Sequence, residues 1–212
     1  MRQLLVLFDV DGTLFLTDDP LAGTALRETL QARFHVELPG DAVERVDHRG
    51  QTALRIGRLV LREAGLLDDE IDEGLADWCN EFAGRYVELL ADADTSGWQG
   101  APGAGAALER LAAAAHRLAL LTGNPEPIAR ARMERLRLER FFPAGQGAFG
   151  CESESRTELI ELARARAGEW PAEATVEIGD TERDTTTARA AGIRSIRVDR
   201  SGLARAVALL SA

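Results

Sequence analysis

The N-terminal segment Leu4–Val10 constrains the fold most, because it is apolar except for Asp9 and does not alternate with polar residues. A strand that is exposed on one face alternates apolar and polar side chains, whereas a strand buried on both faces is apolar along its length. The run is bounded by a glycine turn at Gly12. It therefore predicts a central strand of a parallel sheet, covered on both faces.

Similar short runs recur later in the chain, and segments with apolar residues at helical spacing separate them. The expected strands are Arg117–Thr122, Thr175–Ile178, a weaker Arg194–Val198 and a short piece near Ala148–Gly150. The expected helices are Gly105–Ala115, Pro127–Leu138, Thr157–Ala167 and Asp184–Ala191. Strands that alternate with helices predict an α/β fold with a Rossmann-like, doubly wound parallel sheet.

The alternation is interrupted after the first strand. Three helical segments follow one another there without a strand-like run between them: Leu21–Phe34, Gln51–Ala64 and Glu70–Ala91. Turn-forming residues flank this stretch and mark its hinges. We therefore predict a helical domain at residues 18–98, inserted into a core made of residues 1–17 and 99–212.

The charged residues exclude several classes of function. The formal net charge is -10 and the sequence contains no lysine, so all 25 basic residues are arginines. A chain without lysine has no side-chain amine for a Schiff base and no P-loop lysine for a nucleotide phosphate. The acidic balance argues against nucleic acid or an anionic membrane as a partner, since both need a positive field. No stretch of 18 apolar residues suggests a transmembrane helix.

The two cysteines predict no disulfide framework. Cys79 is expected to be a small buried apolar residue and Cys151 a loop thiol. A reducing cytoplasm is then the expected compartment. For the assembly, a monomer or a homodimer is expected.

Carboxylates and a hydroxyl follow three of the expected strands. Asp9 and Asp11 close the first run, Thr122 closes the second, and Asp180 and Asp184 follow Thr175–Ile178. Ligands of open α/β sheets bind beyond the carboxyl ends of the strands, so these groups should meet at one edge. Carboxylates gathered there repel one another unless a cation binds, and Mg²⁺ is the usual choice near phosphate. The alternative for any single aspartate is a turn or helix N-cap residue.

These segments resemble the motifs of the haloacid dehalogenase superfamily of phosphotransferases. The sequence F-D-V-D-G-T-L is similar to the first motif, L-L-T-G-N to the second and G-D-T-x-x-D to the fourth, in the family's order. The resemblance covers the core from residue 3 to about 198. The helical insert after the first motif resembles the C1 cap of phosphoglycolate phosphatase-like members.

The resemblance implies a role for each matching residue. Asp9 would be the nucleophile that forms an aspartyl phosphate, and Asp11 the general acid and then base. Mg²⁺ would be held by Asp9, by the backbone carbonyl of Asp11 and by Asp180, with Asp184 orienting or binding it. The phosphate cradle would comprise Gly12, Thr122, Gly123 and Asn124.

Two parts of the family pattern need substitutes here. The third motif is a lysine, which this chain lacks, and we expect Arg156 to replace it because arginine keeps the charge and grips phosphate with two hydrogen bonds. The alternative is a solvent-exposed arginine at a helix start. In the cap, the loop expected to reach the substrate contains Arg49, Gly50, Gln51 and Thr52.

The function that these residues favour is a Mg²⁺-dependent phosphatase acting on a small phosphorylated metabolite, phosphoglycolate-like. Two alternatives stay open: a sugar phosphomutase of the same superfamily and a catalytically idle binding protein on this fold. A phosphonatase is disfavoured, because the family's version needs a cap lysine.

Overall fold

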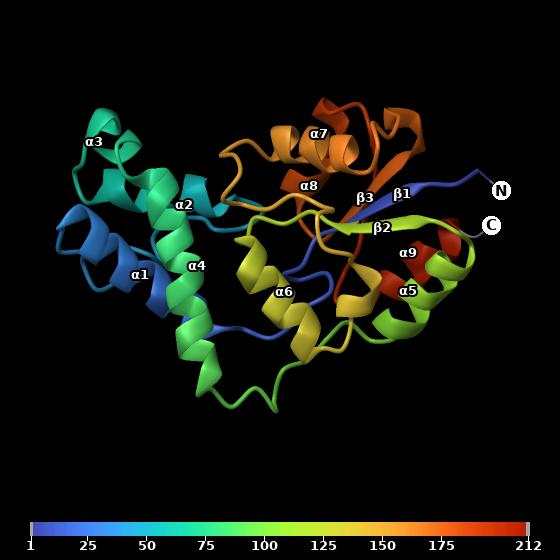
Figure 1. Cartoon of the computed structure of the whole chain (residues 1–212), viewed down its shortest axis with the longest axis horizontal. Helices are drawn as coiled ribbons and strands as arrows, with labels where there is room; N and C mark the ends of the chain where they lie inside the picture. The colour runs from blue at the N-terminus through green and yellow to red at the C-terminus, as the bar shows by residue number, and fades with distance from the viewer. Residues whose placement is uncertain (1, 211–212) are drawn as a thin grey trace.

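The computed structural model describes residues 2–210, and four parallel strands form its central sheet (Figure 1). The strand order is β2-β1-β3-β4. The strands are β1 (Leu5–Phe8), β2 (Arg117–Leu120), β3 (Thr175–Gly179) and β4 (Arg194–Arg197). The predicted parallel α/β sheet is confirmed. Near the predicted strand at Ala148–Gly150 there is one isolated bridge, between Leu121 and Ala148.

Strand β1 lies at the centre of the sheet and is buried on both faces, as its apolar run predicts. Val6 and Phe8 pack on one face, together with helices α5 (Ala104–Ala113), α6 (Glu126–Arg135) and α9 (Leu203–Leu210). Leu5 and Leu7 pack on the other face, with helices α7 (Arg156–Arg166) and α8 (Glu182–Ala190). Successive side chains of a strand point to opposite faces, so both hydrophobic layers depend on this one segment.

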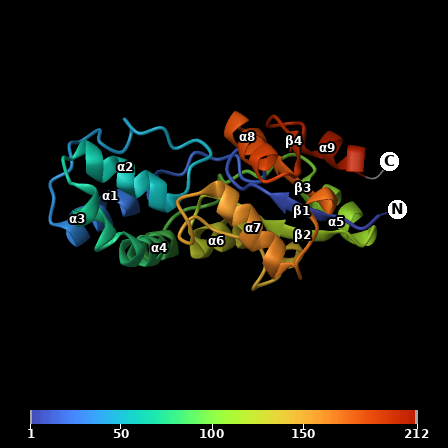
Figure 2. The same cartoon turned by 90° about the horizontal axis from the view of Figure 1, so that it is seen from above.

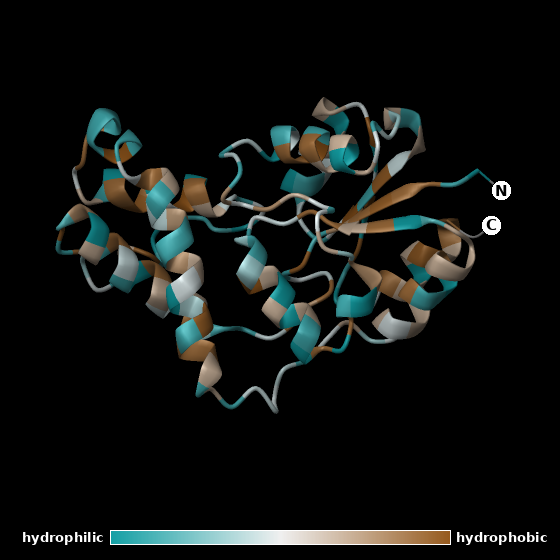
Figure 3. Cartoon of the chain, in the orientation of Figure 1, coloured by the Kyte–Doolittle hydropathy of each residue, from teal (hydrophilic) through white to brown (hydrophobic). Residues whose placement is uncertain are grey.

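The inserted segment forms four helices around a hydrophobic cluster that also takes in Ile128 of α6. These are α1 (Pro20–Phe34), α2 (Ala53–Glu63), α3 (Asp68–Asp72) and α4 (Leu75–Ala91). They lie at one end of the molecule, beside the strand ends that bear the carboxylates (Figure 2). Apolar residues of α1, α2 and α4 pack into one cluster. Hydrophilic residues are interspersed with them along the same helices (Figure 3).

Two details differ from the expectations drawn from the sequence. The single helix expected over Glu70–Ala91 is two helices, because α3 ends at Asp72 and α4 begins after Gly74. Helix α9 was not predicted at all, although its apolar residues complete the hydrophobic layer beside α5. Short 3-10 helices at Glu139–Phe141 and Ala172–Ala174 complete the elements.

The chain enters and leaves the helical insert through two segments that lie side by side. The backbone N–H of Leu16 donates to the carbonyl of Gln99 (2.9 Å), and the N–H of Ala101 donates to the carbonyl of Leu14 (3.0 Å). The N–H of Gln99 also donates to Oγ1 of Thr17 (2.7 Å). These bonds bring the two predicted hinges together, so the insert joins the core through a paired connection.

A disulfide joins the insert to the core, and the prediction of two free cysteines was wrong. Cys79 of α4 is bonded to Cys151, in the loop before α7, with the two Cα atoms 5.6 Å apart. The cysteines are separated by 72 residues in sequence, so only the docking of α4 against this loop brings them together. The expected reducing cytoplasm rested in part on free thiols, and the bond removes that part of the argument.

None of the helices within residues 2–210 has both the length and the apolar character needed to cross a bilayer.

Candidate active site

The turn after β1 presents Asp9 and Asp11 at the edge of the sheet. Asp9 continues the strand for one residue, since its N–H donates to the carbonyl of Ile178 (2.9 Å), and its side chain is buried. The chain then turns sharply at Gly12, whose φ is +77°, a conformation that favours glycine. A Cβ at Gly12 would lie 2.3 Å from Oδ2 of Asp180. The motif therefore needs glycine there for both its backbone conformation and its closeness to the next carboxylate.

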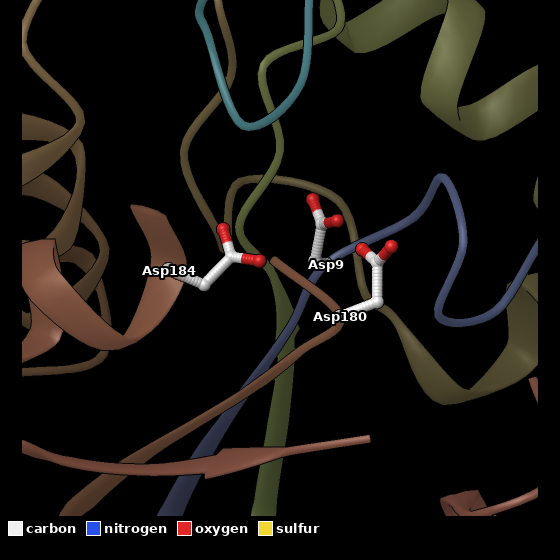
Figure 4. A group of neighbouring side chains, drawn as sticks. All are labelled: Asp9, Asp180 and Asp184. Carbon is white, nitrogen blue, oxygen red and sulfur yellow. The ribbon is translucent and has the colours of Figure 1, made fainter. Parts of the chain in front are cut away.

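Three carboxylates from different segments converge beside this turn (Figure 4). Asp9 follows β1, Asp180 follows β3, and Asp184 lies in the first turn of α8. One carboxylate oxygen from each lies within 4.8 Å of the others. Oδ1 of Asp180 is buried and accepts no hydrogen bond from any residue between 2 and 210, and Oδ1 of Asp184 is buried beside Nη2 of Arg156, 2.9 Å away. Converging carboxylate oxygens of this kind, one of them without a hydrogen-bond donor among those residues, fit a hard divalent cation such as Mg²⁺.

The electrostatics of the three carboxylates also favour a cation. Burial raises the pKa of Asp9 well above its usual value, Arg156 opposes the rise, and the neighbouring Asp184 and Asp11 add to it. Burial likewise raises the pKa of Asp180, with Asp184 contributing. A bound cation removes this penalty by stabilising the ionised forms.

Asp184 combines a capping role with its place in the carboxylate group. Its Oδ2 accepts hydrogen bonds from the backbone N–H (2.8 Å) and the hydroxyl (2.7 Å) of Thr181, the N-cap of α8. A Cβ at Gly179 would lie 2.5 Å from the same oxygen. Oδ2 of Asp184 therefore serves the start of α8, which was the alternative for a single aspartate, whereas Oδ1 faces the other carboxylates.

Arg156 contacts two of these three carboxylates. It is the first residue of α7 and is buried, so the alternative of a solvent-exposed arginine does not describe it. Its Nη2 lies 3.1 Å from Oδ1 of Asp9 and 2.9 Å from Oδ1 of Asp184. Ser155 caps the helix by accepting from the N–H of Glu158, which fixes where α7 begins and hence where Arg156 points.

Glu177 is a fourth acidic group that the sequence analysis missed. It lies in the middle of β3, is fully buried, and places Oε1 3.2 Å from Nη2 of Arg156. Burial raises the pKa of Glu177 to about 7, although Arg156 lowers it. The available signal was a glutamate inside the otherwise uncharged T-V-E-I run. An arginine spreads its charge over more atoms than a lysine, and Glu177 gives this guanidinium an additional partner.

The second motif forms the neighbouring wall of the site. Thr122 is buried, and its Oγ1 accepts from the backbone N–H (3.2 Å) and from Nδ2 (3.0 Å) of Asn124. Gly123 contacts the insert, because its carbonyl accepts from the N–H of Ala53 (2.8 Å) and a Cβ there would lie 1.8 Å from the carbonyl oxygen of Gln51. The start of α2 therefore docks directly onto the second motif.

A cavity of about 570 Å³ lies between the insert and this wall. Three of the predicted cap residues, Arg49, Gly50 and Gln51, line it, as do Asp9, Asp11, Gly12, Thr122, Gly123, Asn124, Arg156 and Asp180. The fourth predicted cap residue, Thr52, lies outside the cavity lining: it is buried and caps α2 by accepting from the N–H of Arg55. The carbonyl of Arg49 accepts from Nε of Arg183 (3.1 Å), which fixes this loop against α8.

Asp11 is held by two donors at the cavity wall. Its Oδ1 accepts from Nη1 of Arg132 (2.7 Å), and its Oδ2 accepts from Nδ2 of Asn124 (2.5 Å). Arg132 was missed from the sequence, because it lies in a helix with several other arginines and no motif marks it.

Comparison with known proteins identifies the family to which this chain belongs. A model of the haloacid dehalogenase-like hydrolase family matches residues 4–192. The chain belongs to this family. The match includes the carboxylates at the strand ends, Arg156 and the whole insert, so the candidate site lies within the matched region.

The individual relatives have low sequence identity to this hydrolase. The hydrolase is 29% identical over 206 residues to a phosphoglycolate phosphatase of Mesorhizobium japonicum, covering 94% of this chain and 84% of that protein. Its fold matches that of CbbY from Rhodobacter sphaeroides in complex with phosphate, with a TM-score of 0.65, 22% identity, and 94% and 88% of the two chains covered. A variant of CbbY in complex with xylulose 1,5-bisphosphate matches over the same shares with a TM-score of 0.66 and 22% identity.

Proposed function

We propose that this hydrolase is a Mg²⁺-dependent phosphatase that acts on a small phosphorylated metabolite, phosphoglycolate-like, through an aspartyl-phosphate intermediate. The observation that carries the proposal is the position of Asp9. Its carboxylate lies on the cavity wall, 3.1 Å from Nη2 of Arg156 and beside the oxygens of Asp180 and Asp184, which would hold Mg²⁺ with it. A nucleophilic carboxylate needs positive charge such as Arg156 and a bound cation around it, because the phosphoryl group that it attacks is itself anionic.

In the first step, an oxygen of Asp9 forms a bond to phosphorus while the bond from phosphorus to the leaving oxygen breaks. Asp11, two residues further along the turn, gives its proton to that leaving oxygen. Arg156 holds Asp9 through Oδ1 and offsets the charge of the phosphoryl oxygens. Asp9, Asp180, Asp184 and the backbone carbonyl of Asp11 would hold Mg²⁺, which would supply further positive charge to the phosphoryl oxygens.

In the second step, Asp11 takes a proton from a water molecule whose oxygen attacks phosphorus. The bond between phosphorus and Asp9 breaks, which releases inorganic phosphate and restores both aspartates. We expect the hydroxyl of Thr122 and the backbone N–H groups of Gly12, Gly123 and Asn124 to supply the phosphate cradle in both steps. In this structure the N–H of Gly12 donates to the carbonyl of Phe15 (2.8 Å) and the N–H of Asn124 donates to Oγ1 of Thr122 (3.2 Å), so these two donors would exchange those bonds for phosphoryl oxygens.

The substrate class is proposed from the cavity and the relative together. The cavity admits a small molecule, and Arg49 on its lining offers a cation to a carboxylate or hydroxyl group of the substrate. A phosphoglycolate phosphatase is similar over 94% of this chain. We further propose that residues 18–98 act as the C1 cap that selects the substrate, over a core of residues 1–17 and 99–212.

The experiment is a measurement of phosphate release from p-nitrophenyl phosphate and from a panel of metabolites that includes phosphoglycolate, with Mg²⁺ and with EDTA. We expect release that requires Mg²⁺ and that is abolished by Asp9→Asn, with the variant still folded by circular dichroism. Conversion of a sugar phosphate without net phosphate release would favour the mutase. Absence of turnover on every substrate would favour the idle binding protein.

A further inference from the structure

Arg132 is a buried arginine that lies between the core and the helical insert. It comes from α6, which packs against α4 of the insert, and its side chain is 3% exposed. A buried guanidinium is costly unless carboxylates or other acceptors surround it. Its partners therefore show what this residue connects.

The two ends of the guanidinium bind different parts of the molecule. Nη1 donates to Oδ1 of Asp11 (2.7 Å) and to Oδ1 of Asn124 (3.3 Å), both at the cavity wall. Nη2 donates to Oδ2 of Asp19 (2.9 Å), the N-cap of α1 at the hinge of the insert. The same Asp19 oxygen accepts from the hydroxyl of Tyr86 in α4 (2.6 Å). One side chain thus links the second aspartate of the first motif to two helices of the insert.

Aromatic rings restrict the guanidinium further. Its central carbon lies 4.8 Å from the centre of the Phe15 ring and 5.6 Å from the centre of the Tyr86 ring. Phe15 belongs to the core connection and Tyr86 to the insert. Contacts of this kind hold a cation over the ring faces and leave it few alternative positions.

We propose that Arg132 is a positioning residue that sets the orientation of the Asp11 carboxyl group and ties it to the position of the insert through Asp19 and Tyr86. The proposal rests on the proposed function, in which Asp11 protonates the leaving oxygen. With one oxygen bound by Arg132 and the other by Asn124, the carboxyl group has a single orientation in this arrangement. A movement of α1 or α4 displaces Asp19 or Tyr86, and Arg132 transmits that displacement to Asp11.

A purely structural arginine would not need the contact with Asp11. Asp19 is as deeply buried as Arg132, each side chain being 3% exposed, and this pair alone would compensate the buried charge. The Asp11 side chain is 52% exposed, so solvent would satisfy it without the arginine. The hydrogen bond from Arg132 to Asp11 therefore mainly orients the Asp11 carboxyl group, since neither side chain needs this bond to compensate its charge.

The test uses the dependence of turnover on the leaving group. Phenyl phosphate needs its leaving oxygen protonated, whereas 2,4-dinitrophenyl phosphate releases a stable anion and does not. Because kcat/KM reports the steps up to the first phosphoryl transfer, the ratio of the two kcat/KM values measures the acid function of Asp11 alone. Asp11→Asn provides the reference for complete loss of that function.

We expect Arg132→Gln to lower kcat/KM for phenyl phosphate about 10- to 100-fold, a part of the 10²–10⁴-fold that acid–base catalysis typically contributes. The value for 2,4-dinitrophenyl phosphate should change much less. The matched control is Arg130→Gln, which removes an arginine of the same helix whose bonds go to Glu126, Phe142 and Pro143 instead. This control should leave the ratio unchanged. Tyr86→Phe, which keeps the ring and removes the hydroxyl, should shift the ratio in the same direction by a smaller factor.

Each outcome decides the matter. A leaving-group effect in Asp11→Asn but none in Arg132→Gln overturns the positioning role and leaves the proposed function intact. No leaving-group effect in Asp11→Asn means that the proposed function fails and this inference with it. If Arg132→Gln does not fold, Arg132→Lys and Tyr86→Phe take its place, and an unchanged ratio in both refutes the proposal.

Discussion

Removal of the disulfide should destabilise the protein by an amount that depends on the number of residues between the two cysteines. Cys79→Ala and Cys151→Ala together open a cross-link between residues separated by 72 positions. Closing a loop of that length lowers the entropy of the unfolded chain, and the corresponding stabilisation is about 4 kcal/mol. With a urea dependence of about 2 kcal/mol per M, the unfolding midpoint should fall by about 2 M.

The assay is urea unfolding followed by tryptophan fluorescence and far-ultraviolet circular dichroism. The wild type is measured with and without reductant, and the double alanine variant under the same two conditions. The reduced wild type should unfold close to the variant, and the variant should not respond to reductant. These comparisons separate the cross-link from the loss of two small side chains.

Two results would refute the reasoning. Titration of the unfolded, unreduced wild type that finds two free thiols would show that the bond is absent. A midpoint that shifts by less than about 0.5 M on reduction would show that the cross-link does not restrict the unfolded chain as the loop length requires.

Three further predictions concern the site. Arg156→Ala should lower kcat about 100- to 1,000-fold, as removal of one charge-stabilising donor does, while Arg156→Lys restores part of the loss; both are measured by phosphate release. Gly123→Ala should destabilise the protein by about 1–3 kcal/mol in thermal or urea unfolding, because its Cβ would lie 1.8 Å from the carbonyl oxygen of Gln51. The control is Gly105→Ala in α5, where the added Cβ would have no atom within 4 Å, and this variant should be neutral or stabilising. Mg²⁺ should stabilise the protein more at pH 8 than at pH 5. Burial raises the pKa of Asp9, so between the unfolded and folded pKa values the folded protein keeps a proton that the unfolded chain has released. The stability of the metal-free protein therefore falls as pH rises above about 4, and Mg²⁺ binding offsets that loss.

Each of these has an outcome that contradicts it. Near-normal turnover by soluble Arg156→Ala protein would remove this arginine from the mechanism. Equal stability of the two glycine variants would mean that α2 does not dock tightly on the second motif. A Mg²⁺-induced rise in melting temperature that is the same at both pH values would show that no proton is displaced when the metal binds.

The sheet and the position of its active edge could be predicted because both depend on local patterns. An apolar run such as Leu4–Phe8 is recognisable within a few residues, and a carboxylate that follows it must lie at the carboxyl end of the strand. Asp9, Asp180 and Asp184 meet there for that reason. Arg156 was predicted from a different kind of signal: the family that the motifs resemble has a lysine as its third motif, and the chain contains no lysine.

Boundaries and short elements were harder, because small local effects decide them. Thr52 belongs to the predicted cap loop but serves as the N-cap of α2, which removes it from the cavity lining. Gly74 separates two helices in a segment whose apolar spacing predicts a single helix. In both cases the backbone hydrogen bonds at a helix end outweigh the hydrophobic pattern.

The sequence by itself determined the alternation of strands and helices, the helical insert and the carboxylates at the strand ends, since each follows from residues close together in the chain. The tertiary structure decided which distant side chains became partners: Cys79 with Cys151, Glu177 with Arg156, and Arg132 with Asp11 and Asp19. The physical reason is that such pairs form only when helices dock, and docking depends on the packing of whole hydrophobic surfaces. Nothing within a few residues of Cys79 or Arg132 records what will lie against it.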